Sequence, residues 1–208
     1  MLSKILLLSL EKENTDLLAV VARSVKEMSE GELLQIEKSR TLDITEEEYF
    51  NVIRKKTASL ISTCCEAGAI SAGKHQEREN MRMFGEKVGL AFQIKDDIFD
   101  YGSPEKIGKP TGLDIREQKL TLPLIYTLRN APLKIQKELK RIIKNKNEDP
   151  RMIKRATDLV IEFGGITYSY EHMNRLAEEA KELLKDYPKS ESKSSLIGLV
   201  DYTMNREK

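Results

Sequence analysis

The sequence has few of the residues on which several classes of protein depend. Its 208 residues include no tryptophan, only 6% aromatic residues and two cysteines. Cys64 and Cys65 are neighbours, and neighbouring cysteines rarely bridge, so we expect neither a disulfide framework nor a zinc site built on cysteine. We predict two small buried side chains in a reducing cytoplasm instead.

Long apolar segments are also missing. A membrane-spanning helix needs about 20 consecutive apolar residues. The best candidate, residues 5–10, is far shorter than this and has no small-residue cleavage site after it. The sequence therefore predicts neither a membrane span nor a signal peptide.

Neither sign of charge is in excess. The chain has 35 Lys and Arg against 34 Asp and Glu, a formal net charge of +1. This balance disfavours a strongly basic nucleic-acid-binding surface, and abundant Leu and Ile disfavour intrinsic disorder. A chain of this length typically folds as one unit, so we expect a single domain over residues 1–208.

Strand signals are absent, whereas helix signals recur. Apolar residues are spaced three and four apart along most of the chain. Thr45 and Glu48 have the spacing of a capping box, and Asp149 precedes Pro150 as at a typical helix start. Stop signals lie at Gly102, at 164–165 and at 187–188. We predict an all-α protein, a multi-helix bundle of about nine helices.

Two segments predict opposite positions in the bundle. Residues 57–73 are rich in Ala, Ser, Thr, Cys and Gly and carry one acidic residue, Glu66. Small side chains allow close approach of helices, so this helix should lie in the middle. Residues 171–185 have many Glu and Lys at helical spacing, which indicates a solvated outer face.

The most informative segment is residues 84–101. Asp96, Asp97 and Asp100 lie in the last turn of a largely apolar helix, just before Gly102. The C-terminus of a helix carries roughly −0.5 charge, so three carboxylates there are unfavourable without a cation. We expect them to converge on a hard ion such as Mg²⁺, which prefers oxygen ligands and shares its shell with phosphates. The alternative is an acidic helix end exposed to solvent.

The following loop favours the metal interpretation. It contains Gly108, Lys109, Gly112 and then Lys119. Lysines neutralise phosphate oxygens, and glycines let the backbone approach a polyanion closely. The spacing is not that of a P-loop, and no strand precedes it.

These segments together resemble the trans-isoprenyl diphosphate synthases, or polyprenyl transferases. Residues 89–101 resemble the second aspartate-rich motif of that family, and residues 108–123 resemble its continuation. Lys56 and Thr57 resemble the family's Lys-Thr site, residues 28–35 the helix before it, and residues 199–206 the family's C-terminus. The sequence of residues 31–35 and 54–68 is most similar to that of long-chain family members of the octaprenyl or solanesyl type.

The resemblance implies the isoprenoid synthase fold, a cytoplasmic homodimer and a Mg²⁺-dependent transferase of isoprenoid biosynthesis. Isopentenyl diphosphate would attack an allylic diphosphate head to tail, after the diphosphate leaves and an allylic cation forms. The resemblance assigns metal binding to Asp96, Asp97 and Asp100. It assigns the diphosphate to Lys56, Lys109 and Lys119, and the path of the cation to Thr57 and Gln93. The expected catalytic set is Lys56, Thr57, Gln93 and Lys109.

The chain also departs from the family pattern. Asp96 and Asp97 form its only adjacent aspartate pair, whereas the family has two aspartate-rich motifs. The family's N-terminal Gly-Lys-Arg-x-Arg-Pro segment is missing as well. We interpret the chain as an N-terminally truncated synthase or a genuine short subunit, and we predict that it catalyses poorly alone. A non-catalytic partner of a complete synthase and a structural helical module are the alternatives.

Four further residues leave two interpretations open. Glu32 and Gln35 either hydrogen-bond metal-bound water or form a plain polar helix face. Arg206 and Lys208 either fold over a diphosphate or belong to a solvated basic tail. The histidines, His75 and His172, lack partners at ligand spacing and are expected to be exposed or to cap helices.

Overall fold

The computed structural model describes Lys4 and residues 15–39, 43–102 and 111–206. The described chain is helical and contains no strand, which confirms the predicted fold class. Its ten α-helices are one more than expected, because α7 is a single short turn. They are α2 (Thr15–Ser39), α3 (Glu46–Ile53), α4 (Ser59–Ser71), α5 (Arg78–Phe99), α7 (Leu113–Arg116), α8 (Leu122–Asn130), α9 (Leu133–Asn145), α10 (Pro150–Glu162), α11 (Gly165–Glu182) and α12 (Glu191–Asn205).

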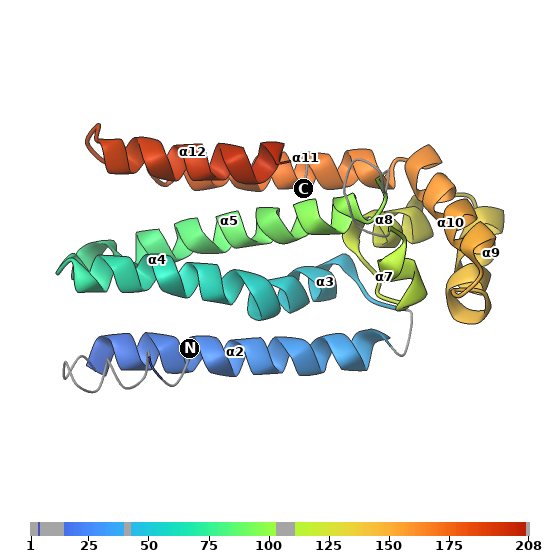
Figure 1. The fold of residues 1–208 in the computed structure, drawn as a ribbon, viewed down its shortest axis with the longest axis horizontal. Helices are drawn as coiled ribbons and strands as arrows, with labels where there is room; N and C mark the ends of the chain where they lie inside the picture. The colour runs from blue at the N-terminus through green and yellow to red at the C-terminus, as the bar shows by residue number, and fades with distance from the viewer. Residues whose placement is uncertain (1–3, 5–14, 40–42, 103–110, 207–208) are drawn as a thin grey trace.

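The long helices lie side by side, and the short ones gather at one end (Figure 1). Helix α5 runs through the middle, packed against α4 on one side and against α11 on the other. Its side chains Phe84, Ala91 and Ile94 are at most 1% exposed and belong to the central core. Helices α7 to α10 cover the C-terminal end of α5, where the aspartates lie.

Helices α3 and α4 are joined by a π-helical turn, η1 (Arg54–Ala58). Two glycines let neighbouring helices approach this turn. A Cβ added to Gly31 of α2 would lie 2.6 Å from the backbone nitrogen of Lys56. One added to Gly89 of α5 would lie 2.6 Å from the Cα of Ala58. π-Turns interrupt the regular helical ladder and occur frequently at functional sites. This one contains the Lys-Thr pair.

The predicted helix boundaries are largely confirmed. Thr45 and Glu48 form a complete capping box at the start of α3, and Asp149 caps α10. Helix α10 ends at Glu162, and its C-cap Phe163 is followed by Gly164, which has a φ of 82°. Such left-handed backbone favours glycine, so this stop signal acts as the sequence predicts.

The predicted layering is also confirmed, with one correction. The small-residue helix α4 lies between α2 and α5, and α11 buries Met173 and Leu176 while Glu171 is exposed. The prediction that both cysteines are buried is wrong, because Cys64 is exposed and Cys65 is half-buried. These adjacent residues cannot share one helix face, so only Cys65 turns toward Gly85 of α5.

Among the described helices, none has both the length and the apolar character needed to cross a membrane.

Candidate active site

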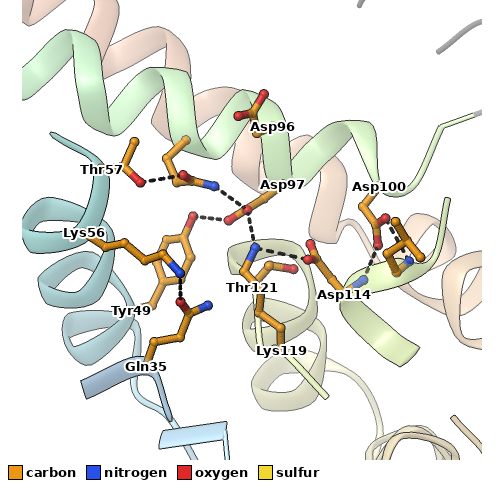
Figure 2. A network of polar contacts seen from close by, with 12 residues as sticks. Gln35, Tyr49, Lys56, Thr57, Asp96, Asp97, Asp100, Asp114, Lys119 and Thr121 are labelled. Atoms are coloured by element: carbon orange, nitrogen blue, oxygen red, sulfur yellow. Dashed lines mark hydrogen bonds and ion pairs between the residues drawn. The ribbon is translucent and has the colours of Figure 1, made fainter. Parts of the chain in front are cut away.

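The candidate site lies where the C-terminal half of α5 meets α2, α3, the π-turn and the turn before α8 (Figure 2). Next to it, a cavity of about 260 Å³ is lined by Gln35, Tyr49, Lys56 and Lys119, among others. Charged groups of both signs thus surround a partly apolar hollow.

Asp97 is at the centre of this site. Its side chain is 2% exposed and accepts three hydrogen bonds. Tyr49 Oη donates to Oδ2 at 2.7 Å, while Gln93 Nε2 and Lys119 Nζ donate to Oδ1 at 3.0 and 3.2 Å. A buried carboxylate is stable when its oxygens are satisfied in this way.

Lys119 joins this carboxylate to a second one. Its ammonium group also donates to Asp114 Oδ1 at 3.1 Å. Burial alone would lower the pKa of Lys119, but the two carboxylates outweigh it and raise that pKa, so the ammonium remains charged. Burial raises the pKa of Asp114 to about 7; Lys119 opposes the shift, and repulsion from Asp97 adds to it.

The backbone before Lys119 is strained. Gln118 has a φ of 57°, and among the described residues it is the one that is not glycine and has a positive φ. Such a conformation is uncommon for residues other than glycine and is found at functional sites. The Gln118 side chain is held by a hydrogen bond to the Ile143 carbonyl at 3.1 Å.

Asp100 ties the end of α5 to the next helix. Its two oxygens accept the backbone N–H groups of Leu113 and Asp114, each at 2.9 Å. Gly112, with a φ of 77°, makes the turn that brings these groups into place. Burial raises the pKa of Asp100, although the two N–H groups oppose this shift.

Asp96 points away from the other two aspartates (Figure 2). It pairs with Arg206, whose guanidinium also lies 4.2 Å from the centroid of the Phe92 ring. The structure thus gives Arg206 a carboxylate and an aromatic ring as partners, and its side chain is 14% exposed rather than solvated.

Lys56 and Thr57 project from the π-turn toward different neighbours. Lys56 Nζ lies 2.6 Å from both Gln35 Oε1 and Glu32 Oε2 on α2. Thr57 donates its hydroxyl hydrogen to Gln93 Oε1 at 2.8 Å. Glu32 and Gln35 therefore hold a lysine of the predicted diphosphate site, which is a more specific role than a plain polar face.

The expected convergence of three carboxylates is not observed. Asp96, Asp97 and Asp100 bind three separate sets of donors, and the part of the chain that the structure describes has no group of three His, Cys, Asp or Glu placed to hold a metal. Repulsion drives like charges apart when each has its own donors. The carboxylate oxygens of Asp96 and Asp100 are still ligands of the type that Mg²⁺ prefers.

Comparisons with known proteins identify the family of this chain. The family model described as polyprenyl synthetase matches residues 1–160, which is most of the chain. The chain belongs to the polyprenyl synthetase family.

Curated members of the family are similar over part of their length. A short chain isoprenyl diphosphate synthase of Methanothermobacter thermautotrophicus is 36% identical over 91% of this chain and 58% of its own length. Solanesyl-diphosphate synthase 2 of Oryza sativa is 32% identical over 93% of this chain and 47% of its own. The chain thus spans about half to three fifths of such relatives.

Solved structures of polyprenyl synthases share the fold. The polyprenyl synthase of Caulobacter crescentus, complexed with calcium and isoprenyl diphosphate, superposes with a TM-score of 0.90 at 32% identity. The match covers 97% of this chain and 62% of that one. The isoprenoid synthase fold predicted from the sequence is confirmed.

Most of the predicted site residues therefore lie in one region. Thr57, Gln93, Asp97 and Lys119 form one connected set of hydrogen bonds, and Asp100 adjoins them through Asp114. Lys56 is bound to Gln35 and Glu32 instead and lines the same hollow as Lys119. Lys109 lies outside the described residues, together with Gly108. Its predicted role remains a prediction.

Sequence reasoning missed one residue of the candidate site and misjudged one histidine. Tyr49 was not expected in the site, but it lies seven residues before Lys56 and lines the same hollow. His172 is not an exposed or capping residue, because it packs between the rings of Phe50 and Tyr168. His75 is exposed as expected.

Proposed function

We propose that this chain acts in a prenyl diphosphate synthase, which joins isopentenyl diphosphate head to tail to an allylic diphosphate. One observation carries the proposal. The π-turn and the turn before α8 bring Lys56 and Lys119 to one partly apolar hollow, and a chain of hydrogen bonds connects Lys119 through Asp97 of the aspartate-rich helix end to Gln93 and Thr57. A substrate with a charged diphosphate and an apolar tail needs both kinds of lining.

Lys56 and Lys119 would hold the allylic diphosphate, with Lys109 as a third predicted contact. Their ammonium groups offset the negative charge that grows on the leaving diphosphate when the allylic bond breaks. Lys56 is 38% exposed on its side chain, so it can exchange Glu32 for a phosphate oxygen. Lys119 is already oriented by Asp97 and Asp114.

Thr57 and Gln93 would line the path of the allylic cation. Thr57 and Gln93 share a hydrogen bond in the network that reaches Lys119, and an oxygen dipole aimed at a developing positive charge lowers its energy. The C4 double bond of isopentenyl diphosphate then attacks the cation, and a proton is lost to the departed diphosphate. Apolar helical walls keep water from the cation.

The aspartate-rich motif would hold Mg²⁺ together with the diphosphate, as its carboxylates and adjacent lysines fit that pair. Mg²⁺ supplies charge neutralisation of the leaving group when bound. Asp96 is 39% exposed, whereas Asp97 is 2% exposed and already has three donors. Direct ligation by Asp97 and Asp100 remains a prediction.

We also propose a long-chain product of the octaprenyl type, because the sequence of residues 31–35 and 54–68 is most similar to that of long-chain family members. Solanesyl and nonaprenyl diphosphate synthases are each 32% identical to this chain, against 36% for a short chain isoprenyl diphosphate synthase and 33% for a geranylfarnesyl diphosphate synthase, so this proposal rests on those two segments. The two unbridged cysteines favour a reducing compartment such as the cytoplasm. Exposed Leu33 and Ile36 on α2 favour a homodimer, which sedimentation velocity tests.

Calorimetry tests the proposed function directly. The 208-residue chain is titrated with a non-reacting thiolodiphosphate analogue of an allylic substrate, with and without Mg²⁺. We expect binding that requires Mg²⁺ and weakens at least about tenfold in Asp96→Ala, because one ligand of the ion is lost.

Asp158→Ala serves as the control, since Asp158 is an exposed aspartate on α10 that pairs only with Lys154 among the described contacts. Equal binding with and without Mg²⁺, or equal loss in both variants, would contradict the proposal.

A further inference from the structure

Asp97 differs from its two neighbours in how its oxygens are used. Both oxygens of Asp97 accept hydrogen bonds from side chains, and 2% of the side chain is exposed. An ionised carboxylate can only accept, so every group that touches it must present a donor. Asp97 therefore imposes a direction on the hydrogen bonds around it.

The amide of Gln93 takes its direction from this carboxylate. Because Nε2 must face Asp97, Oε1 faces the other way and accepts the hydroxyl hydrogen of Thr57 at 2.8 Å. The hydroxyl hydrogen of Thr57 is used in this bond, so the hydroxyl can meet any further group only with its oxygen lone pairs. A hydroxyl that presents lone pairs stabilises positive charge, whereas one that presents its hydrogen opposes it.

Tyr49 keeps Asp97 in this role. Its ring is 3% exposed and packs edge-to-face on Phe50, with centroids 5.4 Å apart, and its hydroxyl donates to Asp97 Oδ2 at 2.7 Å. The capping box of Thr45 and Glu48 fixes the start of the helix one turn earlier. The Tyr49 hydroxyl donates its hydrogen to this carboxylate oxygen of Asp97, and the buried position of Tyr49 holds the pair in place.

We propose that Tyr49 and Asp97 are positioning residues, which fix the Gln93–Thr57 hydrogen-bond chain so that Thr57 presents lone pairs to a cationic substrate carbon. The consequence for catalysis rests on the proposed function. The direction of the chain is a property of the free protein and can be measured without substrate.

The test observes the side-chain amide of Gln93 by NMR in the ¹⁵N-labelled 208-residue chain. Tyr49→Phe removes a single oxygen from the network, and Asp97→Asn puts an amide where the carboxylate was. We expect the Gln93 amide hydrogens to shift and to exchange with solvent about tenfold faster in both variants, because their acceptor is loosened or replaced. Gln93→Glu, which removes these hydrogens, assigns the signal.

Tyr168→Phe is the matched control. The Tyr168 hydroxyl also donates to a carboxylate oxygen, that of Glu46 at 2.8 Å, but lies outside the Asp97 network. Tyr168→Phe should leave the chemical shifts and the exchange rate of the Gln93 amide hydrogens unchanged. An unchanged amide in Tyr49→Phe, or an equal change in Tyr168→Phe, would overturn the inference. Failure of the wild-type chain to bind the diphosphate analogue with Mg²⁺ would instead count against the proposed function. The NMR result would still decide whether Tyr49 and Asp97 orient the Gln93 amide.

Discussion

Glu66 is a buried charge that joins three helices. Its side chain is 2% exposed on α4 and pairs with Arg23 of α2 and, at 2.8 Å, with Arg78 of α5. A buried carboxylate with two cationic partners is a network that fails when one member is removed. The sequence shows Glu66 as the one charge in a segment of small residues, but only the structure shows why it is tolerated there.

We predict that Glu66→Gln lowers the free energy of unfolding by about 1–3 kcal/mol, because two arginines lose their shared counter-charge. Urea titration with circular dichroism measures this. Glu79→Gln is the control, since Glu79 also pairs with an arginine, Arg82, but is 62% exposed and should cost less than about 1 kcal/mol. Equal losses would show that burial does not matter here.

Asp114 makes the stability depend on pH. Its pKa is raised to about 7, mainly by burial, whereas an unfolded aspartate titrates near 4. The folded protein therefore holds this proton more tightly than the unfolded chain does, so deprotonation between about pH 4 and 7 costs folding free energy.

Between pH 4.5 and 8, the wild type should lose about 1–3 kcal/mol of unfolding free energy relative to Asp114→Asn, which cannot titrate there. Parallel urea titrations of the two proteins at both pH values give this difference. If the two proteins change in parallel with pH, Asp114 does not carry the effect.

Among the helices, the π-turn depends on two glycines in its neighbours. It places Lys56 and Thr57 beside α2 and α5, and a Cβ at Gly89 would lie 2.6 Å from the Ala58 Cα and 2.8 Å from its Cβ. Backbone atoms cannot yield as a flexible side chain can, so the helices would have to separate.

Gly89→Ala should therefore destabilise the protein by about 1–3 kcal/mol, as overpacking does. Gly68→Ala is the control within α4, because nothing lies within 4 Å of the added Cβ. It should instead stabilise the fold by up to about 1 kcal/mol through better helix propensity. Thermal unfolding of both variants checks the sign, and stabilisation by Gly89→Ala would refute the close-packing argument.

At the scale of the whole molecule, the described residues form a connected candidate site, and the sequence has one adjacent aspartate pair. We predict that the purified 208-residue chain incorporates radiolabelled isopentenyl diphosphate poorly or not at all in the presence of Mg²⁺, because the sequence lacks a second aspartate-rich motif to share the ion. Robust polyprenyl product from this chain would refute the prediction. The calorimetric binding test separates lost chemistry from lost binding.

The sequence by itself determined the helical fold, most helix boundaries and the segments that form the candidate site. These depend on short-range rules: apolar spacing, the Thr45–Glu48 cap, and three aspartates within five residues. The resemblance to prenyl synthases added the lysines and Thr57. Such features are local, so they can be recognised without knowing which helices touch.

The tertiary structure decided how those residues are used. It directed Asp96 to Arg206, Asp97 to Tyr49 and Asp100 to the start of α7, where convergence was expected. It also exposed Cys64, and it placed His172 between two aromatic rings. Partners far apart in sequence set these outcomes, because the direction of a side chain depends on which donors and surfaces the packed helices bring to it.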